Sequence, residues 1–159
     1  MFRLWRRFAS SRAPAPRERA LALLRRHKYD EAAEAFTTLL MHAELPQERA
    51  FLYNKRGVAR VALHHVEVAR EDFAAADASV DGYAPALTNL GNLLLEEGDV
   101  AGAIGRYERA IALDANYALA HLNLSAAYKR VGRFDDAVRS LRRALALERP
   151  TSVFRRRSR

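Results

Sequence analysis

Few side chains in this 159-residue chain have the types and spacing that acid–base or metal chemistry needs. His64 and His65 are adjacent, and adjacent histidines rarely bind one metal ion together. His121 stands alone, and the acidic pairs Glu96–Glu97 and Asp135–Asp136 are typical of helix ends and solvated surfaces. The sequence has no cysteine, no glycine-rich phosphate loop and no Ser/His/Asp grouping. We therefore predict a non-enzymatic protein without a metal or cofactor, with His64 and His65 in a loop and His121 in the core or at an interface.

A local pattern that recurs every 34 residues is the strongest structural signal in the sequence. Ala69, Ala103 and Ala137 stand at this spacing, and internal repeats of this length indicate stacked units. The same frame carries Gly57, Gly91 and Ser125; Val66, Val100 and Phe134; Phe73, Tyr107 and Leu141; and Ala76, Ala110 and Ala144. An earlier copy fits with a slip of three residues, through Ala20, Tyr29, Ala32, Phe36 and Leu39. Apolar residues recur at helical spacing and no segment alternates as a strand would, so we predict helices alone.

This pattern resembles the tetratricopeptide repeat, a family whose unit is a hairpin of two antiparallel helices. Residues 84–117 are the most similar copy, with signature residues at Leu90–Gly91, Ala103, Tyr107 and Ala110. The other copies span about residues 13–49, 50–83 and 118–151, and the first of them is the loosest. The resemblance implies an all-α fold, a right-handed superhelical solenoid of about four antiparallel helix pairs. We place the repeat domain at residues 16–148, between an N-terminal tail, 1–15, and a C-terminal tail, 149–159.

Small residues and turn residues support the hairpins on physical grounds. Gly91 and Ala103 are predicted to let two helix backbones approach closely, so that Tyr107 fills the remaining gap against the neighbouring repeat. Gly98 and Gly132 are predicted to end the preceding helices, because glycine tolerates left-handed backbone angles. Three aspartates are predicted to begin the second helices, where they cap free amide groups and meet the positive end of the helix dipole: Asp30, Asp99 and Asp135.

The resemblance also implies a binding surface, because in this family the first helix of each hairpin lines a concave groove for peptides or helices of other proteins. The matching places are Phe51, Asn54, Lys55, Val58, Val61, Thr88, Asn89, Asn92, Leu95, Glu96, Leu122, Asn123, Ala126, Lys129 and Arg130. We single out Asn89, Asn92 and Asn123, because an amide can donate to and accept from a partner's backbone and asparagine is unfavourable inside helices. The alternative is a solvated asparagine. Lys55, Lys129 and Arg130 favour a partly acidic partner.

Some members of the family hold the C-terminal carboxylate of chaperone tails with paired lysine, asparagine and arginine residues. Asn89 matches that set. Asn54 and Val58 stand where a lysine and an asparagine are needed, and Leu119 and Asn123 replace the later basic pair. We therefore predict that this chain has no carboxylate clamp.

Two arginines occupy packing places of the second repeat. Arg56 and Arg60 stand where the sister repeats carry Leu90, Leu94, Leu124 and Tyr128. A charge at such a place must be paired or must reach solvent. Resemblance to a variant repeat suggests that Arg56 pairs with Asp72, and an anion site made by both arginines is the alternative.

The net charge of +8 resides in the two tails. Residues 1–19 contain six arginines and one glutamate, residues 149–159 contain five arginines, and the rest has 16 basic and 18 acidic residues. The N-terminal tail places aromatic residues opposite arginines, which suits a disordered or loosely docked tail, a membrane-surface helix or a mitochondrial targeting segment. The C-terminal tail is a basic run that suits solvent, phosphate or anionic lipid. The candidates for membrane or anion contact are Phe2, Arg3, Trp5, Arg6, Arg7, Arg155, Arg156 and Arg157.

These observations favour a non-enzymatic adaptor or scaffold that binds a peptide or helix of a partner protein in the groove. The alternatives are a membrane-surface assembly factor tethered by the N-terminal tail and a nucleic-acid-associated protein that acts through its arginine tails. No apolar stretch approaches the ~20 residues that span a bilayer. We see no capping helix after Glu148, so the last repeat is predicted to meet the C-terminal tail, a partner or a second copy. We expect a bacterial cytoplasmic protein, with a membrane-associated or mitochondrial location as the alternative.

Overall fold

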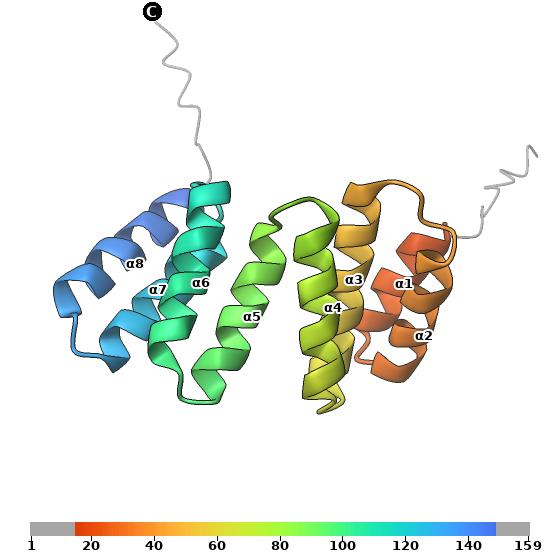
Figure 1. The fold of residues 1–159 in the computed structure, drawn as a ribbon, viewed down its shortest axis with the longest axis horizontal. Coiled ribbons are helices and arrows are strands. Elements are labelled where there is room, and N and C mark those ends of the chain that lie inside the picture. The colour runs from red at the N-terminus through yellow and green to blue at the C-terminus, as the bar shows by residue number, and fades with distance from the viewer. Residues whose placement is uncertain (1–14, 149–159) are drawn as a thin grey trace, which may run out of the picture.

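The computed structural model describes residues 15–148, which form eight helices and no strand (Figure 1). Consecutive helices pair into hairpin 1 (α1 and α2), hairpin 2 (α3 and α4), hairpin 3 (α5 and α6) and hairpin 4 (α7 and α8), which follow one another along the long axis. The predicted all-α solenoid of four helix pairs is confirmed. The helices are α1 Pro16–Arg25, α2 Tyr29–Leu40, α3 Pro46–Ala62, α4 Val66–Ser79, α5 Ala84–Glu96, α6 Val100–Leu113, α7 Ala118–Arg130 and α8 Phe134–Glu148.

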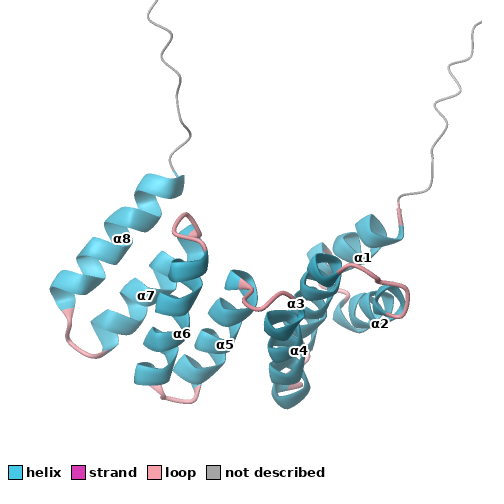
Figure 2. Cartoon of the chain, turned by 45° about the horizontal axis from the view of Figure 1, so that its top comes forward, coloured by secondary structure: helices cyan, strands magenta, loops and turns pink. Residues whose placement is uncertain are grey.

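Neighbouring hairpins contact one another through the first helix of the later hairpin. α3 packs on α2, α5 on α4 and α7 on α6, and the first helices also contact each other in the pairs α3–α5 and α5–α7. Figure 2 shows the same succession of hairpins from a second direction. The first helices of hairpins 2 to 4 therefore lie in a row along one side of the solenoid. In the part of the chain that the structure describes, no helix is long and apolar enough to cross a membrane.

The contact between a glycine and an aromatic ring sets the spacing inside hairpins 2 and 3. A Cβ atom built on Gly91 would lie 2.5 Å from Cε1 of Tyr107, and one built on Gly57 would lie 2.6 Å from Cε1 of Phe73. Both rings are essentially fully buried. The expected close approach of two helices at Gly91 is confirmed, but the gap that the Tyr107 ring fills lies within its own hairpin. The same ring also belongs to an apolar cluster with residues of α7, so it contacts the neighbouring repeat as predicted.

The turns confirm the two predicted glycines and correct two of the three aspartates. Gly98 and Gly132 have φ values of 90° and 75°, the left-handed conformation that favours glycine. Asp99 is an N-cap whose side chain accepts a hydrogen bond from the Gly102 amide. Asp30 and Asp135 are instead the second residues of α2 and α8, so they meet the helix dipole from inside the first turn.

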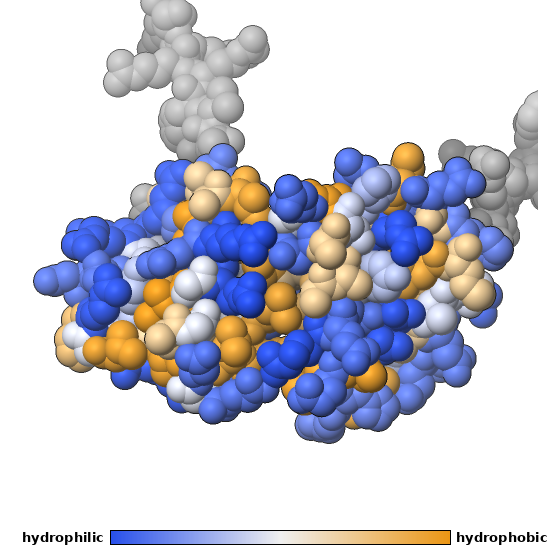
Figure 3. All heavy atoms as spheres, in the orientation of Figure 1, coloured by the Kyte–Doolittle hydropathy of each residue, from blue (hydrophilic) through white to orange (hydrophobic). Residues whose placement is uncertain are grey.

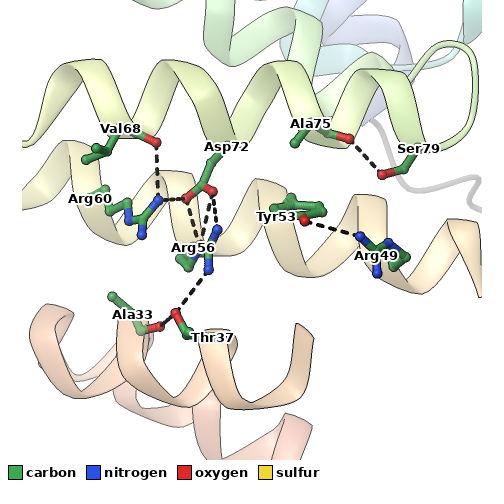
Figure 4. Close-up of polar contacts among 10 residues, drawn as sticks. All are labelled: Ala33, Thr37, Arg49, Tyr53, Arg56, Arg60, Val68, Asp72, Ala75 and Ser79. Carbon is green, nitrogen blue, oxygen red and sulfur yellow. Dashed lines mark hydrogen bonds and ion pairs between the residues drawn. The ribbon is translucent and has the colours of Figure 1, made fainter. Parts of the chain in front are cut away.

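A cluster of charged side chains joins hairpins 1 and 2 (Figure 4). Asp72, only 2% exposed, accepts hydrogen bonds from Arg56 at 2.6 Å (Nη2 to Oδ1) and from Arg60 at 2.8 Å (Nη1 to Oδ2). Arg56 Nη1 also donates to the Thr37 hydroxyl on α2, and Arg60 Nη1 to the Val68 carbonyl. The expected pairing of Arg56 with Asp72 is confirmed. Both arginines are held by the protein's own acceptors, which is why charged residues fit at packing places.

Candidate functional site

A pocket of about 140 Å³ lies between the first helices of hairpins 2 and 3. Its apolar wall consists of Val58 and Val61 from α3, Leu93 from α5 and the Phe73 ring. Its polar lining consists of Asn89, Asn92 and Glu96, which stand on α5. The pocket thus combines an apolar cavity with hydrogen-bonding groups at its edge, the arrangement that ligand sites use to take one apolar group and orient it.

Two pairs of asparagines connect the first helices. The Asn89 amide donates to Oδ1 of Asn54 on α3 at 2.8 Å, and the Asn123 amide donates to Oδ1 of Asn92 on α5 at 2.8 Å. The hydroxyl of Tyr107 donates to the same Asn92 oxygen at 2.8 Å. Asn92 Oδ1 therefore accepts two hydrogen bonds, while its Nδ2 group donates none within residues 15–148. These contacts hold Asn89 and Asn92 in fixed orientations beside the pocket.

The structure places the predicted groove residues at different depths. Asn54 is 3% exposed and Thr88 is fully buried, with its hydroxyl bonded to the Ala84 carbonyl. Thr88 is therefore a core residue, which corrects its place in the predicted groove, and Asn54 reaches the groove only through Asn89. Lys55 lies with its ammonium group 5.5 Å from the centre of the Phe51 ring.

Two basic residues of the predicted groove, Lys129 and Arg130, lie apart from the pocket, on α7 of hairpin 4. Arg130 donates from Nη1 to the Leu95 carbonyl at 2.8 Å and so ties α7 to α5. Lys129 lines a different pocket, between α7 and α8. Reasoning from the sequence missed Phe73 and Leu93, because they belong to the core pattern and only their edges reach the cavity.

The buried hydroxyl of Tyr107 supports Asn92 and gives the fold an alkaline limit. Burial raises the pKa of Tyr107 to about 12, and the carboxylate of Glu96 acts in the same direction. Below the usual tyrosine pKa of 10, both the folded and the unfolded chain hold this proton. Between pH 10 and about 12 the unfolded chain releases the proton first, so the free energy of unfolding must fall as the pH rises.

We expect Tyr107→Phe to flatten this alkaline loss of stability. Guanidinium unfolding at several pH values from neutral to about 11 measures the slope. The variant loses about 1 kcal/mol near neutral pH, because one hydrogen bond to Asn92 is gone. Part of the slope remains, since the pKa values of Tyr83, Tyr117 and Tyr128 are also raised, mainly by burial. An unchanged slope in Tyr107→Phe would contradict the role of this hydroxyl.

The histidines occupy the expected kinds of places. His64 lies in the turn before α4 with a φ of 62°, and His65 is the N-cap residue of that helix. His121 is 9% exposed, and its Nε2 atom lies 3.1 Å from the Ala115 carbonyl. Within residues 15–148, no group of three histidine or acidic side chains is arranged to hold a metal ion.

The residues predicted to contact membranes or anions lie outside the described part of the chain. For Phe2, Arg3, Trp5, Arg6 and Arg7, and likewise for Arg155, Arg156 and Arg157, that contact stays a prediction.

Two family models match the chain, one described as TPR repeat over residues 91–132 and one as tetratricopeptide repeat over residues 120–152. Residues 91–152 therefore carry tetratricopeptide repeats, as the sequence pattern suggests. The comparison with curated proteins gave no match.

Several solved structures have the same fold. A crystal structure of MamA has a TM-score of 0.66 and 23% identity, covering 81% of this chain and 74% of MamA. The MamA 41-end chain from Desulfovibrio magneticus RS-1 has a TM-score of 0.65 and 19% identity, with 87% and 78% covered. The second TPR of Spaghetti (RPAP3), bound to the HSP90 peptide SRMEEVD, has a TM-score of 0.59 and 24% identity, with 65% and 90% covered. At these identities the likeness shows the fold alone.

Proposed function

We propose that this protein is a non-enzymatic scaffold that holds an extended segment of a partner protein along α3, α5 and α7. The observation that carries the proposal is the pocket beside Asn89 and Asn92, with its apolar wall and oriented amides. The second TPR of Spaghetti, which has the same fold, is bound to a peptide. That complex supports the use of this fold for holding a polypeptide.

The contacts of the asparagines suggest how the segment is held. The Nδ2 group of Asn92 donates to a carbonyl of the partner's backbone, and Oδ1 of Asn89 accepts from a backbone N–H. A neighbouring apolar side chain enters the pocket against Val58, Val61 and Phe73. Because the amides contact the backbone, the pocket supplies most of the selectivity, and it selects for an apolar residue.

We further propose that the segment is internal to the partner, with an acidic part that lies towards Lys55 or towards Lys129 and Arg130. A free carboxyl terminus needs basic side chains at the places of Asn54 and Leu119. Asn54 is buried and Leu119 is an exposed apolar residue, so the chain offers that terminus no charged partner there. SRMEEVD is therefore expected not to bind.

Asn92→Asp is the sharpest variant for testing this proposal. A carboxylate keeps the acceptor for Tyr107 and Asn123 but removes the donor that faces the groove, so the fold is kept while the contact is lost. Asn116→Asp is the matched control, because Asn116 is exposed, lies after α6 and accepts a hydrogen bond from Arg143.

The experiment selects peptides from a random library on the full chain and measures their affinities by calorimetry. We expect an enriched apolar residue in the peptides and a loss of about tenfold in affinity for Asn92→Asp, which corresponds to about 1.4 kcal/mol. Asn116→Asp should bind as the native chain does. Equal affinities of Asn92→Asp and the native chain, or an enriched free carboxyl terminus, would overturn the proposal.

A further inference from the structure

The end of the solenoid at hairpin 4 carries an open apolar surface. We name it the C-end face and define it by Leu122, Ala126, Lys129, Phe134, Val138 and Leu141, which line a pocket of about 350 Å³. Phe134 is 64% exposed and Val138 is 46% exposed. Figure 3 shows apolar residues reaching the surface at this end of the molecule, near the turn between α7 and α8. An apolar surface of this kind indicates a contact site.

The repeat shows what kind of element fits on the C-end face. The residues 34 positions before Phe134, Val138 and Leu141 are Val100, Ile104 and Tyr107 of hairpin 3. Inside the chain these three residues lie in one apolar cluster with Leu124, Ala127 and Tyr128, which α7 contributes. The C-end face is therefore the surface on which the first helix of a following hairpin would pack.

The opposite end of the chain presents such a helix. We name this surface the N-end face and define it by Pro16, Arg19, Leu23, Glu34, Ala35 and Leu39, which line a pocket of about 440 Å³ between α1 and α2. Three repeats of 34 residues and the slip of three residues in the first copy add up to 105 residues. At this separation Leu23 and Ala35 correspond to Tyr128 and Ser140, which line the junction between hairpins 3 and 4. The N-end face thus repeats places that an internal junction of this chain already uses.

Polar contacts of the internal junction also have counterparts at the two ends. Arg130 donates to the Leu95 carbonyl at the junction of hairpins 3 and 4. Arg25 holds the place of Arg130 in hairpin 1, and Lys129 holds the place of Leu95 in hairpin 4. The same bond can therefore form from Arg25 of one copy to the Lys129 carbonyl of another. Arg139 and Glu108 line the pocket at this junction.

The places of Arg139 and Glu108 are held by Glu34 on the N-end face and by Arg142 on α8. The two charges are exchanged but remain opposite. The N-end face also carries a cation of its own, Arg19, which offsets the attraction between Glu34 and Arg142. The pair of Glu34 and Arg142 therefore sets the register of the contact more than its strength.

We propose that the occupant of the C-end face is the N-end face of a second copy of this chain. Copies then stack head to tail and continue the solenoid across the contact. Such an interface joins two different surfaces, so every assembly keeps one free face of each kind and grows with concentration rather than stopping at two copies. The contact shares Leu122, Ala126 and Lys129 with the predicted groove. It leaves the pocket beside Asn89 and Asn92 free, so it does not depend on peptide binding at that pocket.

Two variants of the full chain block one face each. Val138→Arg places a charge at the centre of the C-end face. Leu23→Arg does so on the N-end face, at the place that Arg60 occupies in hairpin 2, where Asp72 pairs with it. Ala35 holds the place of Asp72 in hairpin 1, so the new arginine has no such partner, and Lys129 and Arg142 repel it across the contact. Ala35→Arg is a second N-end variant, and Val68→Arg, on the exposed side of α4, is the control.

Sedimentation velocity of the full chain over a wide range of concentration is the test, with circular dichroism as the measure of folding. The native chain and Val68→Arg are expected to form growing assemblies, and each end variant alone is expected to be a monomer. A mixture of Leu23→Arg and Val138→Arg should form a 1:1 pair, because the intact C-end face of the first variant meets the intact N-end face of the second. The pair should grow no further, since both of its outer faces carry the new arginine. A native chain that stays monomeric overturns the proposal. So does a Leu23→Arg chain that still pairs while Val138→Arg does not, since that result means a symmetric contact between two C-end faces.

Discussion

Gly91→Ala is expected to lower the free energy of unfolding by about 1–3 kcal/mol, the usual cost of overpacking a well-packed core. The new methyl group would stand 2.5 Å from Cε1 of Tyr107. The ring cannot swing away without cost, because it is fully buried and its hydroxyl is bonded to Asn92. Urea unfolding followed by circular dichroism measures the loss.

Gly105→Ala is the matched control for this prediction. Gly105 lies in α6, is exposed, and has no atom within 4 Å of a built Cβ. The same substitution should stabilise the chain there by up to about 1 kcal/mol, because alanine is the better helix former. Gly91→Ala combined with Tyr107→Leu should recover part of the loss, since hairpin 4 pairs Ser125 with Leu141 at these places. Equal effects of Gly91→Ala and Gly105→Ala would contradict the close packing of the ring.

Asp72→Ala is expected to cost about 3 kcal/mol, because it leaves Arg56 and Arg60 without their common carboxylate. The side chains of these arginines are 15% and 25% exposed, so they reach solvent only in part. Thermal and urea unfolding of the full chain measure the loss. A replacement of all three residues by those of hairpin 4, Arg56→Leu, Arg60→Tyr and Asp72→Ser, should recover most of it.

Asp136→Ala is the control for burial. Asp136 also pairs with two arginines, Arg133 and Arg139, but its side chain is 22% exposed and both arginines are more than half exposed. Ion pairs of this kind contribute about 0–1 kcal/mol each. A loss for Asp72→Ala no larger than that for Asp136→Ala would show that the buried cluster adds little to stability.

The hairpins could be predicted from the sequence because their packing repeats with the chain. Gly57 and Gly91 stand 34 residues apart, as do Phe73 and Tyr107, so one contact between a glycine and a ring is made twice. The pairing of Arg56 with Asp72 could be predicted because a charge at a packing place needs an opposite charge close by.

The depth of single side chains could not be predicted from the same pattern. The bond between Asn89 and Asn54 joins residues 35 positions apart, so the two are not equivalent places of the repeat. Asp30 and Asp135 lie two residues further into their helices than Asp99 does, because both are second residues of a helix whereas Asp99 is the residue before one. The sequence pattern alone does not resolve a difference of two residues at a helix end. His27 and His64 adopt φ values of 60° and 62°, which is the left-handed conformation. A glycine in the sequence predicts this conformation, whereas a histidine gives no such indication.

The most direct test of the scaffold is an NMR titration of the ¹⁵N-labelled full chain with the tightest peptide from the random library. We predict that the side-chain amide signals of Asn89 and Asn92 shift first, together with backbone signals of α3 and α5 around Val61 and Leu93. Shifts confined to α4, α6 or the C-end face, with the asparagine amides unchanged, would contradict the claim that the row of first helices holds the partner.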